Sequence, residues 1–206
     1  VTILSVNKTR ELMGAVCAHF LLGVVCLLPI FYFEVFSMRK KARRLAYAAI
    51  IAALYAVLTH FQNILLPGSA TWAIQLRMSE ALSILAFFTP AAPLGLAIGC
   101  LLTNLLSPYG PVDVIFGTLA TAIAAWLTIK MPRWYLAAIP PIVLNLIFLP
   151  PIWAWTQMGG YTNGFWGAWA FNALTFVIGE VIACYGLGTL LLRLLPKIPG
   201  LPLKKR

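Results

Sequence analysis

Long uninterrupted apolar runs constrain this chain more than any other feature. Hydrophobic residues make up 62% of its 206 residues and charged residues only 10%, whereas a soluble globular domain carries about 25% charged residues. A chain of this composition has too little polar surface to face water. Because the runs are continuous and rich in Leu and Ala, they favour membrane-spanning helices over the alternating strands of a membrane β-barrel. The sequence therefore predicts an all-α integral membrane protein.

Basic residues predict the orientation of these helices. The net charge is +10, and Lys and Arg gather at the edges of the apolar runs, as they do on the cytoplasmic side of membrane helices. The main groups are 39–44, Lys130 with Arg133, and 204–206. They predict six transmembrane helices with cytoplasmic N- and C-termini and leave no basic–aromatic pattern for nucleic acid. The predicted spans cover 45–62, 74–88, 92–106, 113–129, 134–155 and 165–195.

The first 37 residues do not fit this plan. Met13 to Phe36 is apolar and long enough to span, but it contains Pro29 and Glu34 and has no small-residue cleavage site. Three interpretations stay open: an extra helix, an uncleaved signal-like segment, or an extension from a misplaced start codon ahead of Met38, which we favour. The chain then divides into an apolar N-terminal extension at 1–37 and a six-helix substrate-binding membrane domain at 38–206.

Polar side chains inside the predicted spans mark the candidate site. Ionisable residues are costly in lipid and by default suggest function. Four spans place polar residues in the outer half of the membrane, and the inner half is nearly bare of them. A channel needs polar groups along its whole path, so this layer predicts a pocket open to the outside. The predicted ligand-binding residues are Glu80 and Asp113 as carboxylates, Asn104 and Asn172 as amides, Gln75 and Arg77 at the gate, Trp169 for stacking and Glu180 as a wall residue.

Some of these residues also have a structural interpretation. Arg77 and Glu80 lie one turn apart on one predicted helix face and would pair with each other. Asp113 follows Pro111 where a helix begins, so it would serve as an N-cap. Jointly these explanations are weaker than a pocket, because they leave the other buried polar residues without a role. Carboxylates and amides beside aromatic rings suit a nucleobase-like ligand without demanding one.

Ala48, Ala52 and Ala56 recur at spacings of four in the first predicted span. Small residues at this spacing let another helix backbone approach closely. Two interpretations stay open: packing within the chain, which the spacing alone favours, and docking to a partner membrane protein.

The chain has no motif for catalysis or for a metal. It lacks a P-loop of the form GxxxxGK[ST] and any nucleophile–base constellation. Its four cysteines lack the spacing of a metal site. We therefore expect neither an enzyme nor a cofactor, and we expect an ATPase, if one is needed, to lie on another chain.

Two segments carry a resemblance to a known family. IQLRMSEALSILAFFTPAAPLGLAIGCLLTNL, from Ile74, and DVIFGTLATAIAAWL, from Asp113, resemble the QueT family, which comprises substrate-binding subunits (S components) of energy-coupling factor (ECF) transporters for queuosine precursors. The detailed resemblance covers about 43–127. Family members usually begin near the position of Met38, so residues 1–37 depart from the pattern.

The resemblance implies a six-helix S component in the bacterial cell membrane. Such a subunit captures its ligand from outside and docks on a transmembrane coupling protein driven by two ABC-type ATPases. The implied ligand is a 7-deazaguanine, with a 7-cyano or 7-aminomethyl group, or queuine. Docking uses small residues of the first helix, which correspond to Ala48, Ala52 and Ala56. The alternatives are an S component for another vitamin or base, and a stand-alone secondary carrier, although no inverted repeat is found.

Overall fold

The computed structural model describes residues 40–65, 76–107 and 110–194. The chain divides into two units, 1–43 and 44–206. The predicted extension at 1–37 and the predicted site residue Gln75 lie outside the described residues. The described residues contain helices and turns but no strand.

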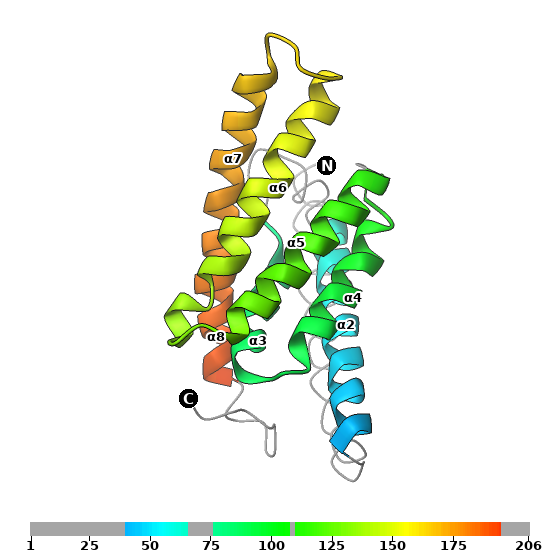
Figure 1. Cartoon of the computed structure of the whole chain (residues 1–206), viewed down its shortest axis with the longest axis vertical. Coiled ribbons are helices and arrows are strands. Elements are labelled where there is room, and N and C mark those ends of the chain that lie inside the picture. The colour runs from blue at the N-terminus through cyan, green and yellow to red at the C-terminus, as the bar shows by residue number, and fades with distance from the viewer. Residues whose placement is uncertain (1–39, 66–75, 108–109, 195–206) are drawn as a thin grey trace, which may run out of the picture. The chain divides into compact units, whose positions relative to one another are not determined.

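Within the described ranges, four helices are long and apolar enough to cross a membrane, and two apolar helices are shorter. This confirms the all-α membrane protein, while the six-span topology with cytoplasmic termini stays a prediction. The elements are α2 (Lys40–Leu65), η1 (Met78–Ile84), α3 (Leu85–Phe88), α4 (Ala92–Asn104), α5 (Pro111–Ile129), η2 (Trp134–Leu136), α6 (Ile139–Met158), α7 (Phe165–Val181), η3 (Ile182–Leu187) and α8 (Gly188–Leu194). In the second unit, α4 packs on α5, α5 on α6 and α6 on α7 (Figure 1).

Prolines and glycines end or start these helices where the backbone requires it. Thr89 is extended (φ −135°, ψ 131°) before Pro90, so α3 ends at Phe88 and α4 begins at Ala92. Helix α6 ends at Gly159, whose φ of 67° is left-handed and suits glycine. Pro150 and Pro151 lie inside α6, which a membrane protein tolerates when neighbouring groups satisfy the freed carbonyls.

The last helix is interrupted by a π-helical segment. η3 joins α7 to α8 without a break in the chain of helical residues, and it packs against η1. π-helical turns are rare and occur frequently at functional sites. In this protein the segment holds Cys184, whose sulfur contacts the Glu80 carbonyl oxygen and the Glu180 carboxylate.

Two glycines of α4 let α2 approach closely. A Cβ atom at Gly95 would lie 2.5 Å from the Ala48 carbonyl oxygen, and one at Gly99 would lie 2.6 Å from the Tyr55 Cβ. Ala48 and Ala52 are buried in this contact, with 2% and 4% exposed. Glycine at both positions is therefore needed for the backbones to meet.

This contact bears on the predicted docking residues. Two of them, Ala48 and Ala52, belong to the internal α2–α4 interface, which is the interpretation that their spacing alone favours. Ala56 is half-buried, whereas Ala49 and Ala53 are exposed. A partner meeting α2 in this conformation would contact the Ala49–Ala53 face.

Gly95→Ala should destabilise the protein. A helix-interior Ala gains about 1 kcal/mol of helix propensity over Gly, but overpacking costs about 1–3 kcal/mol, and the obstructing atom is a backbone oxygen that cannot rotate away. Gly167→Ala is the matched control, because a Cβ there meets nothing within 4 Å. We expect a lower melting temperature in detergent for Gly95→Ala and an unchanged or higher one for Gly167→Ala. Equal melting of the two variants would contradict this packing.

Candidate ligand-binding site

All acidic residues in the described part of the chain are buried. Glu80, Asp113 and Glu180 are 1%, 0% and 1% exposed, and they come from η1, α5 and α7. Removing a carboxylate from water is costly unless it gains hydrogen bonds or an opposite charge. The side chains that form hydrogen bonds or ion pairs with these three carboxyl groups therefore define the site.

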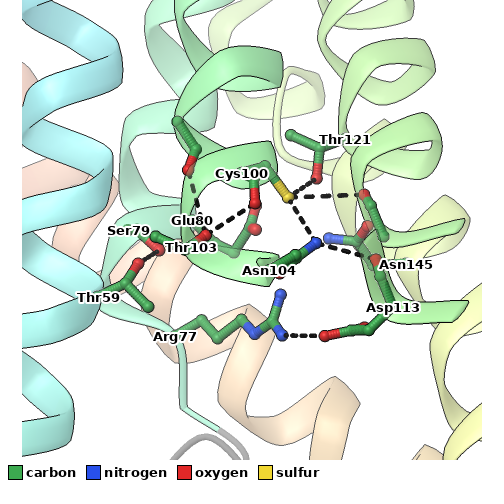
Figure 2. A network of polar contacts seen from close by, with 12 residues as sticks. Thr59, Arg77, Ser79, Glu80, Cys100, Thr103, Asn104, Asp113, Thr121 and Asn145 are labelled. Atoms are coloured by element: carbon green, nitrogen blue, oxygen red, sulfur yellow. Dashed lines mark hydrogen bonds and ion pairs between the residues drawn. The ribbon is translucent and has the colours of Figure 1, made fainter. Parts of the chain in front are cut away.

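Glu80 is held by α2 and by its own helix. The Tyr55 hydroxyl donates to Glu80 Oε1 at 2.6 Å, and Ser83 Oγ donates to Oε2 at 3.0 Å. A second link joins the same elements, because Thr59 Oγ1 donates to Ser79 Oγ at 2.8 Å (Figure 2). The position of the Glu80 carboxylate thus depends on α2.

Glu180 is held by α6 and by the π-helical segment. Asn145 Nδ2 donates to Glu180 Oε1 at 3.3 Å, and Cys184 Sγ lies 3.4 Å from Oε2. The same sulfur lies 3.6 Å from the Glu80 carbonyl oxygen. Cys184 therefore links Glu180 to η1, and its sulfur contacts both glutamates.

Arg77 and Asp113 form a loose ion pair. Their side chains point toward one another (Figure 2), with Arg77 Nη2 3.6 Å from Asp113 Oδ2, longer than a hydrogen bond. Neither Asp113 oxygen accepts a hydrogen bond from any described residue, and Arg77 Nε donates none. The guanidinium carbon lies 5.8 Å from the centre of the Trp153 ring, within cation–π range.

The structural interpretations of these residues do not hold. Arg77 has extended backbone ahead of η1 (φ −113°, ψ 102°), so it shares no helix face with Glu80, and it pairs with Asp113. Asp113 lies in the first turn of α5, but Gly110 occupies the N-cap and no side chain caps the helix. The negative charge of Asp113 still favours this position, because the helix N-terminus is electropositive.

Asn104 supports this arrangement from α4. Its Nδ2 donates to the Asp113 carbonyl oxygen at 3.1 Å and contacts Cys100 Sγ at 3.3 Å (Figure 2). A Cβ at Gly117 would lie 2.6 Å from the same nitrogen, so glycine is needed there. Asn104 therefore positions the first turn of α5 and with it Asp113.

Asn172 and Trp169 have other contacts. Asn172 is buried and donates through Nδ2 to Gln157 Oε1 at 3.0 Å. Trp169 is 38% exposed and packs edge-on against Trp166. Its surroundings form an apolar groove of about 610 Å³, lined by Leu146, Ile147, Pro151, Tyr161, Phe165, Trp166, Trp169 and Ala173. No described contact joins these two residues to the acidic cluster.

Sequence reasoning missed three residues of the cluster. Asn145 carries a signal of the kind that marked Asn104, an amide within a predicted span, and should have been included. Tyr55 and Trp153 carry no such signal, because aromatic residues are common in membrane helices. Trp153 is fully buried between Arg77 and Phe176, whose ring centre lies 5.7 Å from its own.

The buried polar groups without a hydrogen-bond partner indicate which ligand chemistry the site can bind. Around the acidic residues, the unfilled acceptors are the two Asp113 oxygens and Asn145 Oδ1, and Arg77 Nε is an unfilled donor. Buried polar groups without partners are uncommon and call for an explanation. A ligand with several N–H donors and one acceptor would satisfy all of them. The described residues include no group of three His, Cys, Asp or Glu side chains that would hold a metal ion.

The fold and this cluster define a multi-pass helical membrane protein with an internal polar site. Residues 45–197 match the family described as QueT transporter. The chain therefore belongs to the QueT transporter family and is a multi-pass protein of the bacterial cell membrane.

One relative is a protein of Lactococcus lactis subsp. cremoris (strain MG1363) described as "Queuosine precursor transporter QueT". It is 38% identical over 88 residues, which cover 41% of this chain and 48% of that protein. The chain thus matches about half the length of this relative. No solved structure matches the chain.

Tyr55→Phe should destabilise the protein by about 1.5–3 kcal/mol, the contribution of a hydrogen bond to a charged group. The variant keeps the aromatic ring and removes the hydroxyl that donates a hydrogen bond to Glu80. Tyr161→Phe is the control, since Tyr161 is 82% exposed, and its effect should stay within about 0.5 kcal/mol. Equilibrium unfolding in mixed micelles measures both. If the two variants are equally stable, the Tyr55–Glu80 bond does not hold η1 to α2.

Proposed function

We propose that this chain is the substrate-capture subunit (S component) of an ATP-driven ECF uptake transporter for a queuosine precursor. The observation that carries the proposal is the set of unfilled buried hydrogen-bonding groups around Asp113 and Arg77. Membership of the QueT transporter family and the name of the Lactococcus relative support it. The ligand class is a 7-deazaguanine with a 7-cyano or 7-aminomethyl substituent, or queuine.

The chemistry of a guanine-like ring complements these groups. The ring edge carries adjacent N–H donors, which the two Asp113 oxygens accept in parallel, a charge-assisted arrangement that is strong in a dry site. Arg77 donates to the ring carbonyl oxygen. Trp153, already within cation–π distance of Arg77, supplies an apolar wall. Asn104 acts through the backbone of Asp113.

The remaining predicted residues have supporting roles in this proposal. Gln75 and Arg77 close the outer gate, and Glu80 and Glu180 form the second carboxylate wall. Asn172 and Trp169 meet the ligand on its way in or after α7 shifts, since their present contacts lie elsewhere.

Energy comes from partner chains. The sequence has no P-loop, so we propose a transmembrane coupling protein and two ABC-type ATPases as partners. In this proposal the chain itself has six spans and both of its termini lie in the cytoplasm. The docking face on α2 is the exposed pair Ala49 and Ala53, because Ala48 and Ala52 are occupied by α4.

Asp113→Asn should lower the affinity for a 7-deazaguanine by about 10- to 100-fold, the effect of losing hydrogen bonds to a charged group. Glu80→Gln should weaken binding as well. Thr128→Val is the control: Thr128 is fully buried on the same helix but lies about 22 Å further along its axis. Titration calorimetry of purified protein in detergent measures all of them. Absence of saturable binding by the wild-type protein would refute the ligand assignment, and unaltered binding by both acid variants would refute the site.

Ala53→Trp should impair assembly with the coupling protein while leaving ligand binding unchanged. Overpacking of about 1–3 kcal/mol at the interface corresponds to roughly a 5- to 150-fold loss of affinity. Ala170→Trp, at an exposed position of α7, is the control. Co-purification of tagged protein with the coupling protein and ATPases gives the measurement. Equal recovery of complex with both variants would place docking elsewhere, and uptake that persists without the ATPases would favour a secondary carrier.

A further inference from the structure

The buried cluster holds more acidic than basic side chains. Its carboxyl groups are those of Glu80, Asp113 and Glu180, against one guanidinium, that of Arg77. No other Lys or Arg side chain described in the second unit is buried: Arg44, Lys130, Arg133 and Arg193 are exposed. Arg77 forms its ion pair with Asp113, so neither glutamate forms an ion pair with a described Lys or Arg of this unit.

Neutral donors hold the two glutamates. Glu80 accepts from Tyr55 and Ser83, and Glu180 accepts from Asn145 and Cys184. The titratable groups around the pair are Arg77 and three weak acids, Tyr55, Cys100 and Cys184. Hydroxyl, thiol and amide groups lower the cost of burial but carry no positive charge, and two like charges close together in a dry site repel.

The residue that holds Glu180 also carries an unfilled acceptor. Asn145 is 1% exposed, and while its Nδ2 donates to Glu180, its Oδ1 has no partner among the described residues. Glu80, Glu180 and Asn145 Oδ1 together offer three acceptors from three elements. A primary ammonium group has three N–H donors and one positive charge, and it is therefore the group that complements both the geometry and the charge.

We propose that the bound ligand is a cation, with a primary amine held by Glu80 and Glu180. The proposal rests on the proposed function and narrows its ligand to an aminomethyl compound over a nitrile. The heterocycle meets Asp113 and Arg77, and the amine meets the glutamate pair. If the glutamates instead shared protons in the bound state, a neutral substituent would be accepted equally well.

The test compares three ligands that share one ring. These are 7-aminomethyl-, 7-hydroxymethyl- and 7-cyano-7-deazaguanine; the hydroxymethyl compound matches the amine in size but is neutral. Their affinities for full-length protein in detergent at pH 7 are measured by titration calorimetry. We expect the amine to bind about 10- to 100-fold more tightly than either neutral ligand, from charge-assisted hydrogen bonds.

Glu180→Gln then assigns the preference to the glutamate pair. The amide keeps the size of the side chain and removes one negative charge, so the amine should lose at least about tenfold in affinity while the two neutral ligands change little. Their retained binding also shows that the variant is folded.

The outcomes separate the two proposals. If the wild-type protein binds all three ligands equally, or prefers a neutral one, the proposed function stands and the cationic ligand is refuted. If Glu180→Gln weakens all three to the same extent, the amine does not lie at this pair. If the wild-type protein binds none of them, the proposed function fails and this inference fails with it. If the Glu180→Gln variant does not fold, the affinities of the wild-type protein for the three ligands still test whether the bound ligand is a cation.

Discussion

The structure depends on burying three carboxylates inside an apolar helical protein. Each loses its hydration, and each must recover that free energy from hydrogen bonds or from a positive charge. Glu80 and Glu180 recover part of it from side chains on α2, α6 and the π-helical segment. These bonds tie elements that are distant in sequence to one centre, so the polar cluster organises the packing as much as the apolar contacts do.

Close helix packing makes this burial sterically feasible. Gly95 and Gly99 let the α2 backbone reach α4, which brings Tyr55 within hydrogen-bonding distance of Glu80. Gly117 leaves room for the Asn104 amide, which in turn holds the first turn of α5. In lipid, helices gain little from apolar contact alone, so small residues and interhelical hydrogen bonds supply the specificity. The same residues thus serve both the fold and the site.

Asp113 and Arg77 differ from the other members of the cluster. They keep hydrogen-bonding capacity that the described part of the protein does not fill, and their ion pair is long. A site that satisfied itself fully would be more stable but would have nothing to offer a ligand. In our proposal the ligand supplies the missing donors and the missing positive charge, which couples its capture to the packing of α2 and η1 around Glu80.

The sequence by itself determined the class of protein and most of the polar members of the cluster. Hydrophobic runs report lipid exposure directly, and a charged residue within such a run is conspicuous, which is why Glu80, Asp113 and Glu180 were predicted. Only the tertiary structure decided their partners. Arg77 pairs with Asp113 because its backbone is extended, Ala48 and Ala52 face α4, and Trp169 lies in an apolar groove while Trp153 meets Arg77. Helical spacing defines neighbours within one helix, whereas these contacts join different helices, whose rotation and depth are set by packing that no local pattern encodes.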